Sequence, residues 1–225
     1  MRQYHTSMES LENLLREAEV AHGHLCAGQV LGVRMAMLGC RMLGIEDPRG
    51  LMNRADRKRL VTFVEIDRCA TDAIAVVTGC RLGKRALKFR DWGKMAASFL
   101  DLGRPADATL GVEAILGGRA VRIAALESSK DRARETYPHI EGKNAQQMLA
   151  YRELPDEDLF STQRVSIPLH AREMPGYKSA RITCDVCGEG INYDREVVRE
   201  DDAGRQTLCQ SCAFPEARYY QVLAD

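Results

Sequence analysis

Residues 21–45, AHGHLCAGQVLGVRMAMLGCRMLGI, decide how the first part of this chain folds. From about Ala27 onward the segment is apolar almost all round, which predicts a helix buried on every side. Gly28 and Gly32 lack side chains, so another backbone can approach the helix closely at these positions. We therefore expect this helix to lie inside a folded core.

The segments on either side predict both helices and strands. Apolar residues recur at helical spacing between positions 11 and 18, which indicates a first helix with Ser10 as its cap. The buried helix is expected to end at Pro48 and Gly50. Beyond it, the sequence predicts a strand and then a helix, at residues 60–67 and 71–79.

The second half of the core has weaker signals. Two apolar runs joined by Gly117-Gly118 predict a β-hairpin, at residues 109–116 and 119–126. The charged segment that follows predicts helices between residues 127 and 160, with breaks at Pro138, Gly142 and Pro155. A linker rich in proline and glycine then precedes a change in character near residue 178, which divides the chain into two domains, 1–178 and 179–225.

The C-terminal domain contains two Cys-x-x-Cys pairs, Cys184/Cys187 and Cys209/Cys212, with 21 residues between them. Two such pairs at this distance predict a tetrahedral zinc site, and two disulfides are the alternative. Four cysteine ligands leave no open coordination position, so the site is expected to be structural. The order of elements predicts a treble-clef-type finger: a knuckle with Gly188 in its turn, a strand at residues 195–200, and a helix from Cys209 toward Tyr219.

Composition excludes several classes of protein. The chain has 225 residues, 45% hydrophobic and 28% charged, with 32 basic and 32 acidic side chains, so it lacks the basic footprint of a general nucleic-acid binder. No apolar run is long enough to cross a membrane, and the N-terminus has no apolar signal segment. We therefore expect a cytosolic protein. In that compartment its eight cysteines are interpreted as metal ligands or reactive thiols in preference to disulfides.

Further chemistry is expected in the first ninety residues. Histidines and cysteines stand at the edges of predicted elements, where they could converge on one site, namely His22, His24, Cys26, Cys69 and Cys80. Imidazole and thiolate suit zinc or another borderline metal, and fewer than four protein ligands would leave an open position. Two alternatives stay open. Cys26 can be a reactive thiolate, because it lies near a helix start and His24, or these cysteines can simply pack as small hydrophobes, as we expect for Cys40.

These residues also carry a resemblance. The segment His22-Gly-His-Leu-Cys-Ala-Gly-Gln-Val-Leu-Gly-Val-Arg resembles the signature of the FmdE family, which is named for a component of formylmethanofuran dehydrogenase. Four further blocks follow in the family's order, namely Glu65, Cys69-Ala-Thr-Asp72, Thr78-Gly-Cys80-Arg-Leu-Gly83-Lys84 and Asp91-Trp-Gly-Lys94. Ala27 and Arg81 depart from the pattern, which usually has proline and threonine there.

The resemblance implies an α+β core followed by a zinc finger, and an intertwined homodimer. It also implies a metal or active site in a cleft, for which His24, Cys26 and Cys69 are the first choice. The second choices are His22, Glu65, Asp72, Cys80 and Lys84. Asp72 would orient a histidine ligand through its ring nitrogen. Lys84 would meet an anionic group of the substrate, with a solvated turn lysine as the alternative.

The resulting hypothesis is a cytosolic metalloprotein that binds a metal and a small anionic or pterin-like ligand. It would assist one-carbon (formylmethanofuran) or molybdenum- and tungsten-cofactor metabolism, beside a partner enzyme that carries one of these metals. The alternative is a non-catalytic accessory module whose finger docks a partner enzyme. A nucleic-acid reader is disfavoured, because acidic residues outnumber basic ones in the finger.

Overall fold

The computed structural model describes residues 9–53, 59–103, 119–201 and 204–223. The chain divides into two compact units between Leu169 and His170, whereas the sequence placed the boundary near residue 178. Contacts explain the difference. Arg172 donates to the carbonyl of Asp194 at 3.1 Å, and the Tyr177 hydroxyl donates to the Asp194 carboxylate, so the stretch before residue 178 is bound to the second unit.

The first unit is an α+β fold, as predicted. Its five-stranded sheet has the order β2-β1-β3-β4-β5, with β1 and β2 parallel and every other pair antiparallel. The strands are β1 (Leu60–Val64), β2 (Leu87–Phe89), β3 (Ala96–Asp101), β4 (Arg119–Ala125) and β5 (Phe160–Val165). The helices are α1 (Leu11–His22), α2 (Ala27–Met42), α3 (Pro48–Asn53), α4 (Cys69–Thr78), the 3-10 turn η1 (Leu82–Lys84), α6 (Ser129–Thr136), α7 (Lys143–Glu153) and α8 (Asp156–Leu159).

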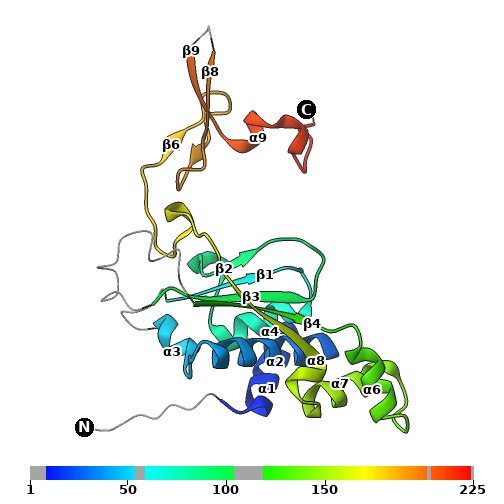
Figure 1. Ribbon diagram of the computed structural model, residues 1–225. Coiled ribbons are helices and arrows are strands. Elements are labelled where there is room, and N and C mark those ends of the chain that lie inside the picture. Colours follow the sequence, from blue (N-terminus) through cyan, green and yellow to red (C-terminus); the bar gives the residue numbers. More distant parts are fainter. Residues whose placement is uncertain (1–8, 54–58, 104–118, 202–203, 224–225) are drawn as a thin grey trace, which may run out of the picture. The chain divides into compact units, whose positions relative to one another are not determined.

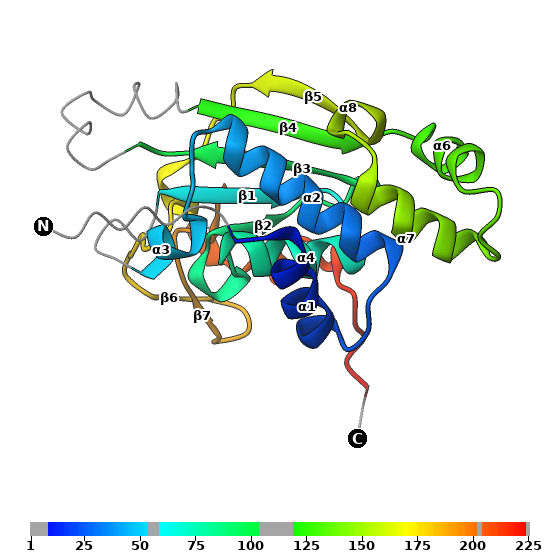
Figure 2. The same ribbon diagram turned by 90° about the horizontal axis from the view of Figure 1, so that it is seen from below.

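Helices α1, α2 and α4 lie together on one face of the sheet, and α2 runs along it (Figures 1 and 2). Every residue of β3 is buried, and this strand lies in the middle of the sheet, between β1 and β4. Gly39 of α2 makes room for the Phe99 ring, since a Cβ atom at position 39 would lie 2.4 Å from that ring. No helix in the described ranges is both long enough and apolar enough to cross a bilayer.

The helices around the core confirm most of the sequence predictions. The Ser10 hydroxyl accepts a hydrogen bond from the Asn13 amide at 3.3 Å, which caps α1 as expected. The predicted end of α2 was wrong. The helix stops at Met42, and Gly44 then takes a left-handed conformation with φ of 68°. Pro48 opens α3 instead of ending α2, because proline fits the first helical position without losing a hydrogen bond.

The strands were harder to predict. The second run of the expected hairpin is β4, but residues 109–118 lie outside the described residues. The observed neighbours of β4 are β3 and β5, and neither was predicted. The sequence of β3, AASFLD, contains no β-branched residue, and that of β5, FSTQRV, contains four consecutive polar residues and lacks the apolar alternation of a strand. The helices α6, α7 and α8 do begin and end at the predicted breaks.

Two glycines of α2 bring this helix close to α4. A Cβ atom on Gly32 would lie 2.5 Å from the carbonyl oxygen of Ala70 and 2.9 Å from the Cβ of Ala73. A Cβ atom on Gly28 would lie 3.4 Å from the Cβ of Cys69, which is ordinary contact. Position 32 therefore requires glycine, whereas position 28 has room for alanine.

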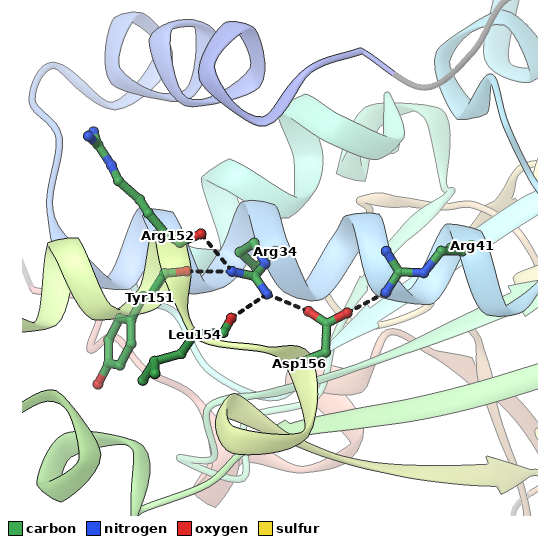
Figure 3. Close-up of polar contacts among 6 residues, drawn as sticks. All are labelled: Arg34, Arg41, Tyr151, Arg152, Leu154 and Asp156. Carbon is green, nitrogen blue, oxygen red and sulfur yellow. Dashed lines mark hydrogen bonds and ion pairs between the residues drawn. The ribbon is translucent and has the colours of Figure 1, made fainter. Parts of the chain in front are cut away.

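Arg34 fastens α2 to the end of α7 (Figure 3). Its guanidinium donates to the carbonyls of Tyr151, Arg152 and Leu154 at 2.9, 3.1 and 2.9 Å, and to Asp156 at 2.7 Å. These carbonyls belong to the end of α7, where no intrahelical donor remains. Arg41, further along α2, pairs with the other oxygen of the same Asp156 carboxylate.

The second unit contains two β-hairpins and a short helix. The elements are η3 (Ala171–Glu173), β6 (Ile182–Thr183), β7 (Gly190–Ile191), β8 (Val197–Asp201), β9 (Gly204–Leu208), α9 (Gln210–Ala213) and η4 (Pro215–Ala217). The predicted strand corresponds to β8, one or two residues further along. The predicted long terminal helix was wrong, because α9 has only four residues and Pro215 opens a separate 3-10 turn.

Replacing Gly32 by alanine should destabilise the core. The new methyl group meets backbone and a small side chain that cannot rotate away, so we expect a loss of about 1–3 kcal/mol in the free energy of unfolding. The matched control is Gly28→Ala, whose methyl group has room, and we expect a change near zero. Urea unfolding of the two variants measures the difference, and equal stabilities would show that the close approach at Gly32 is unimportant.

Replacing Arg34 by lysine should also destabilise the core. An ammonium group cannot reach three carbonyls and a carboxylate at once, so we expect a loss of about 2–3 kcal/mol in the free energy of unfolding. Arg41→Lys is the control, because Arg41 is largely exposed and makes a surface pair with the same carboxylate. A larger loss in Arg41→Lys than in Arg34→Lys would contradict this assignment.

Candidate metal centres

Three helix ends converge in the first unit. His22 is the last residue of α1, Cys26 immediately precedes α2, and Cys69 is the first residue of α4. A ligand atom of each side chain lies within 4.8 Å of the other two, and all three side chains are partly exposed. The residues are therefore close enough to share a metal ion and open enough for a small molecule to reach it.

The chain geometry explains how these side chains meet. Gly23 ends α1 in a left-handed conformation, with φ of 97°, which turns the chain back so that Cys26 follows close to His22. The sulfur of Cys26 makes no hydrogen bond to its own helix. Cys69 comes alongside because α4 packs against the glycine face of α2. Both cysteines thus stand at helix N-termini, where the helix dipole favours a thiolate.

Asp72 holds the imidazole of His22. Its carboxylate lies 2.8 Å from Nδ1 of the ring. An ionised carboxylate accepts a hydrogen bond, so the proton stands on Nδ1 and the lone pair of Nε2 is left for a metal. This contact is the one expected for Asp72. The partner, however, is His22, whereas the sequence favoured His24 as the ligand. His24 is exposed beside the cluster, with its ring centroid 4.9 Å from that of His22.

The donor set fits zinc. Sulfur and nitrogen atoms around a tetrahedral zinc ion lie about 3.8 Å or less apart, so side-chain rotation must close up to about 1 Å of the observed 4.8 Å. Burial raises the pKa of the Cys69 thiol, and the neighbouring Cys26 thiol adds to the rise. Three ligands in a tetrahedral site leave one position for water or another molecule.

Cys80 was also a predicted ligand, but the structure places it elsewhere. It follows the opposite end of α4 from Cys69 and is fully buried. Its sulfur contacts the Thr62 hydroxyl at 3.5 Å and the Leu60 carbonyl at 3.6 Å, and burial raises the pKa of the Cys80 thiol. Cys40 is likewise buried, as expected, and burial raises the pKa of its thiol to about 12.

Two further candidates lie outside the cluster. Glu65 is buried and binds Arg122 through two hydrogen bonds, each of 2.7 Å, so its carboxylate is already used by a structural ion pair. Lys84 lies beyond the C-terminal end of α4 and lines a separate pocket. Neither Glu65 nor Lys84 joins the cluster of His22, Cys26 and Cys69 among the described residues.

The four finger cysteines form a second cluster. Their sulfurs lie within 4.8 Å of one another, and those of Cys187 and Cys209 are 3.8 Å apart, which is close to the separation around a tetrahedral zinc ion. Gly188, with φ of 75°, closes the first knuckle as predicted. Cys209 lies between β9 and α9 and Cys212 lies within α9, so the second pair stands at the start of a helix.

Backbone amides support the thiolate of Cys184, whereas contacts with neighbouring finger cysteines raise the pKa of the Cys212 thiol to about 12. The amides of Cys187 and Cys209 donate to the Cys184 sulfur and lower the pKa of that thiol to about 6. The two knuckles are tied together by Asp185, whose amide donates to the Thr207 carbonyl at 2.9 Å and whose carboxylate accepts from the Thr207 amide at 2.6 Å. The sequence did not predict this role for Asp185, because its partner Thr207 lies 22 residues away on strand β9 of the other hairpin.

The finger has a very small apolar core. Four buried residues make it up, namely Cys184, Ile191, Leu208 and Ala213. Arg218 adds a cation near the cluster, with its guanidinium 3.7 Å from the Cys212 sulfur. A core of this size contributes little hydrophobic stabilisation, so a metal ion held by the four cysteines would supply much of the finger's stability.

Comparisons with known proteins identify the family and the fold of the chain. A protein of Archaeoglobus fulgidus described as a probable S-adenosyl-L-methionine-binding protein is 37% identical over 90 residues, which are 40% of this chain. The matched part is only 24% of that protein, so this chain corresponds to about a quarter of it. The crystal structure of a tungsten formylmethanofuran dehydrogenase FmdE-like protein from Syntrophus aciditrophicus has the same fold.

That structure aligns with a TM-score of 0.56 over 97% of this chain and 100% of its own, at 16% sequence identity. The family described as FmdE, Molybdenum formylmethanofuran dehydrogenase operon, matches residues 21–161. This match includes the α2 segment, both cluster cysteines and most of the sheet. The chain therefore belongs to the FmdE family.

Proposed function

We propose that the first unit binds a zinc ion through His22, Cys26 and Cys69 and uses its fourth coordination position for a small ligand. The observation that carries the proposal is the convergence of these three ligand atoms within 4.8 Å at a partly exposed place. One imidazole and two thiolates also hold the catalytic zinc of alcohol dehydrogenases, where water or substrate takes the fourth position. Such a zinc ion, when bound, polarises the group that coordinates it.

The chain's own residues have distinct roles in this proposal. Asp72 orients the His22 ring through Nδ1, and the N-terminal ends of α2 and α4 favour the two thiolates. His24 lies exposed beside His22, where it is placed to exchange a proton with a ligand at the metal. Among the described residues, the cluster contributes no fourth protein ligand, which supports access by a ligand.

The biological role is proposed from the relatives. The family is described by a molybdenum formylmethanofuran dehydrogenase operon, and one relative is described as a probable S-adenosyl-L-methionine-binding protein. Both descriptions concern small ligands or one-carbon chemistry. We therefore propose that the chain binds a small anionic or pterin-like molecule and works beside a molybdenum or tungsten enzyme. The homodimer stays a prediction, and light scattering would test it.

The accessory role remains the second candidate. Several large apolar side chains of the second unit are exposed, among them Val186, Phe214, Tyr219, Val222 and Leu223. Exposed apolar side chains mark a protein-binding surface where they gather into one patch, and this candidate requires such a patch on the second unit. In this version the finger docks a partner enzyme and the core zinc is absent or only structural.

Metal content separates the two histidines. We expect about two zinc ions per chain in the native protein and about one in His22→Ala, because only His22 completes the core site. His24→Ala is the matched control and should keep about two. Elemental analysis of the protein purified without added metal gives the numbers. A loss in His24→Ala with no loss in His22→Ala would assign the site to His24, and about one zinc ion in the native protein would remove the core metal altogether.

Removing the finger metal should unfold only the second unit. Cys184→Ser takes away a buried ligand from a finger whose apolar core is four residues, so we expect the finger to lose its fold. Limited proteolysis should then cut between residues 182 and 213, while the first unit resists. A chelator should reproduce the cuts in the native chain. A Cys184→Ser finger that stays resistant would show that metal does not hold it together.

A further inference from the structure

A cavity opens at the end of α4 that lies away from the metal cluster. It has a volume of about 530 Å³, which is within the range of small-molecule sites. Helices α1 and α4 form its walls, through Val20, Ala21, Val76 and Gly79. Its charged residues come from four elements, namely Arg16 and Glu17 of α1, Arg49 of α3, Arg81 before η1, and Lys84 of η1.

Positive charge dominates this cavity. Arg49 is held by the carboxylates of Glu17 and Glu9, so it is neutralised where it stands. The other three cations, Arg16, Arg81 and Lys84, form no ion pair among the described residues, although Glu17 lines the same cavity. Even with Glu9 included, four cations stand against two carboxylates, which leaves a surplus of two positive charges.

Arg81 is fixed with its charge intact. Its guanidinium donates to the carbonyl of Ala75 and, at 3.1 Å, to that of Cys80. These two hydrogen bonds hold the Arg81 side chain at the C-terminal end of α4. Because carbonyl groups carry no net charge, they do not neutralise the guanidinium. Arg16 and Lys84 form no ion pair in the described part of the chain, and both are exposed. All three are therefore available to an incoming anion.

The cavity and the metal cluster lie along one stripe of α4. Asp72, which holds His22, is followed on the same helical face by Val76 and Gly79, which line the cavity. Seven residues of α-helix span about 10 Å. A molecule anchored in the cavity by an anionic group would therefore reach the metal with its other end.

We propose that this cavity binds the phosphate group of a phosphorylated small molecule. A phosphate carries about −1.5 to −2 charges near neutral pH, which matches the surplus of two. Guanidinium forks, supplied here by Arg16 and Arg81, suit phosphate oxygens because they donate two parallel hydrogen bonds. The inference deepens the proposed function, since it assigns the anionic end of the ligand, but it uses none of the metal-binding residues.

Phosphate titration tests the assignment. Inorganic phosphate is titrated by calorimetry at about 0.1 M salt, with acetate as the carboxylate comparison. The double variant Arg16→Gln/Lys84→Gln should lose affinity for phosphate about tenfold. The control Lys130→Gln/Arg134→Gln removes the same two charge types from exposed α6 and should bind phosphate within about twofold of the native protein. Lys84→Arg should keep binding, because the positive charge remains.

The outcomes are distinct. Equal losses in both double variants would overturn the proposal, because binding would then reflect net charge alone. Equal affinity for acetate and phosphate would overturn the choice of phosphate. Thermal melting of each variant checks that the fold is intact, and both replaced residues are exposed, so folding is not at risk.

The metal site is tested separately. Phosphate can also coordinate zinc, so the titration is repeated with Cys26→Ser/Cys69→Ser, which cannot hold the core metal. Binding that persists in this variant belongs to the cavity, and binding that disappears with the two cysteines overturns the proposal. If the native chain holds about one zinc ion but still binds phosphate selectively, the proposed metal role of the core cluster is wrong and the cavity assignment stands.

Discussion

The close approach of α2 and α4 is the contact on which the rest of the first unit depends. Gly32 allows it, because a Cβ atom there would lie 2.5 Å from the Ala70 carbonyl oxygen. The same approach brings Cys69 to Cys26, since these residues stand at the matching N-terminal ends of the two helices. A helix pair held further apart would keep a similar core but would separate the two sulfurs. The short distance between α2 and α4 thus determines both the packing of these helices and the positions of Cys26 and Cys69.

Burial then decides which cysteines can do chemistry. Cys40 and Cys80 are fully buried, and burial raises the pKa of both thiols. They behave as small apolar side chains. Cys26 and Cys69 differ in exposure, because they lie at helix starts and their side chains are partly exposed, although burial raises the pKa of the Cys69 thiol as well. The number of cysteines in the sequence says nothing about this division, whereas their place relative to helix ends does.

Much of this arrangement can be read from the sequence where the signal is local. The helices α1, α2 and α4 follow from apolar spacing, and the four finger cysteines follow from their own spacing. Strands β3 and β5 do not, because their residues become strand-like only between neighbours that are far away in sequence. The sequence also cannot distinguish His22 from His24 as the metal ligand, for the same reason. Both histidines fit the motif, and only the approach of Asp72, 50 residues later, selects His22.

The two candidate metal centres differ in what they would leave open. Four thiolates would complete the coordination of a tetrahedral ion in the finger, where the amides of Cys187 and Cys209 also stabilise the Cys184 thiolate. Such a centre holds a fold and has no position for a substrate. The core cluster has three donors, a histidine oriented by a carboxylate, and a cationic cavity on the same stripe of α4. A fold that needed metal only for stability would have no use for an open position beside a positively charged cavity. The difference in the number of donors therefore separates a cluster suited to a structural ion, in the finger, from one that would leave a coordination position open, in the first unit.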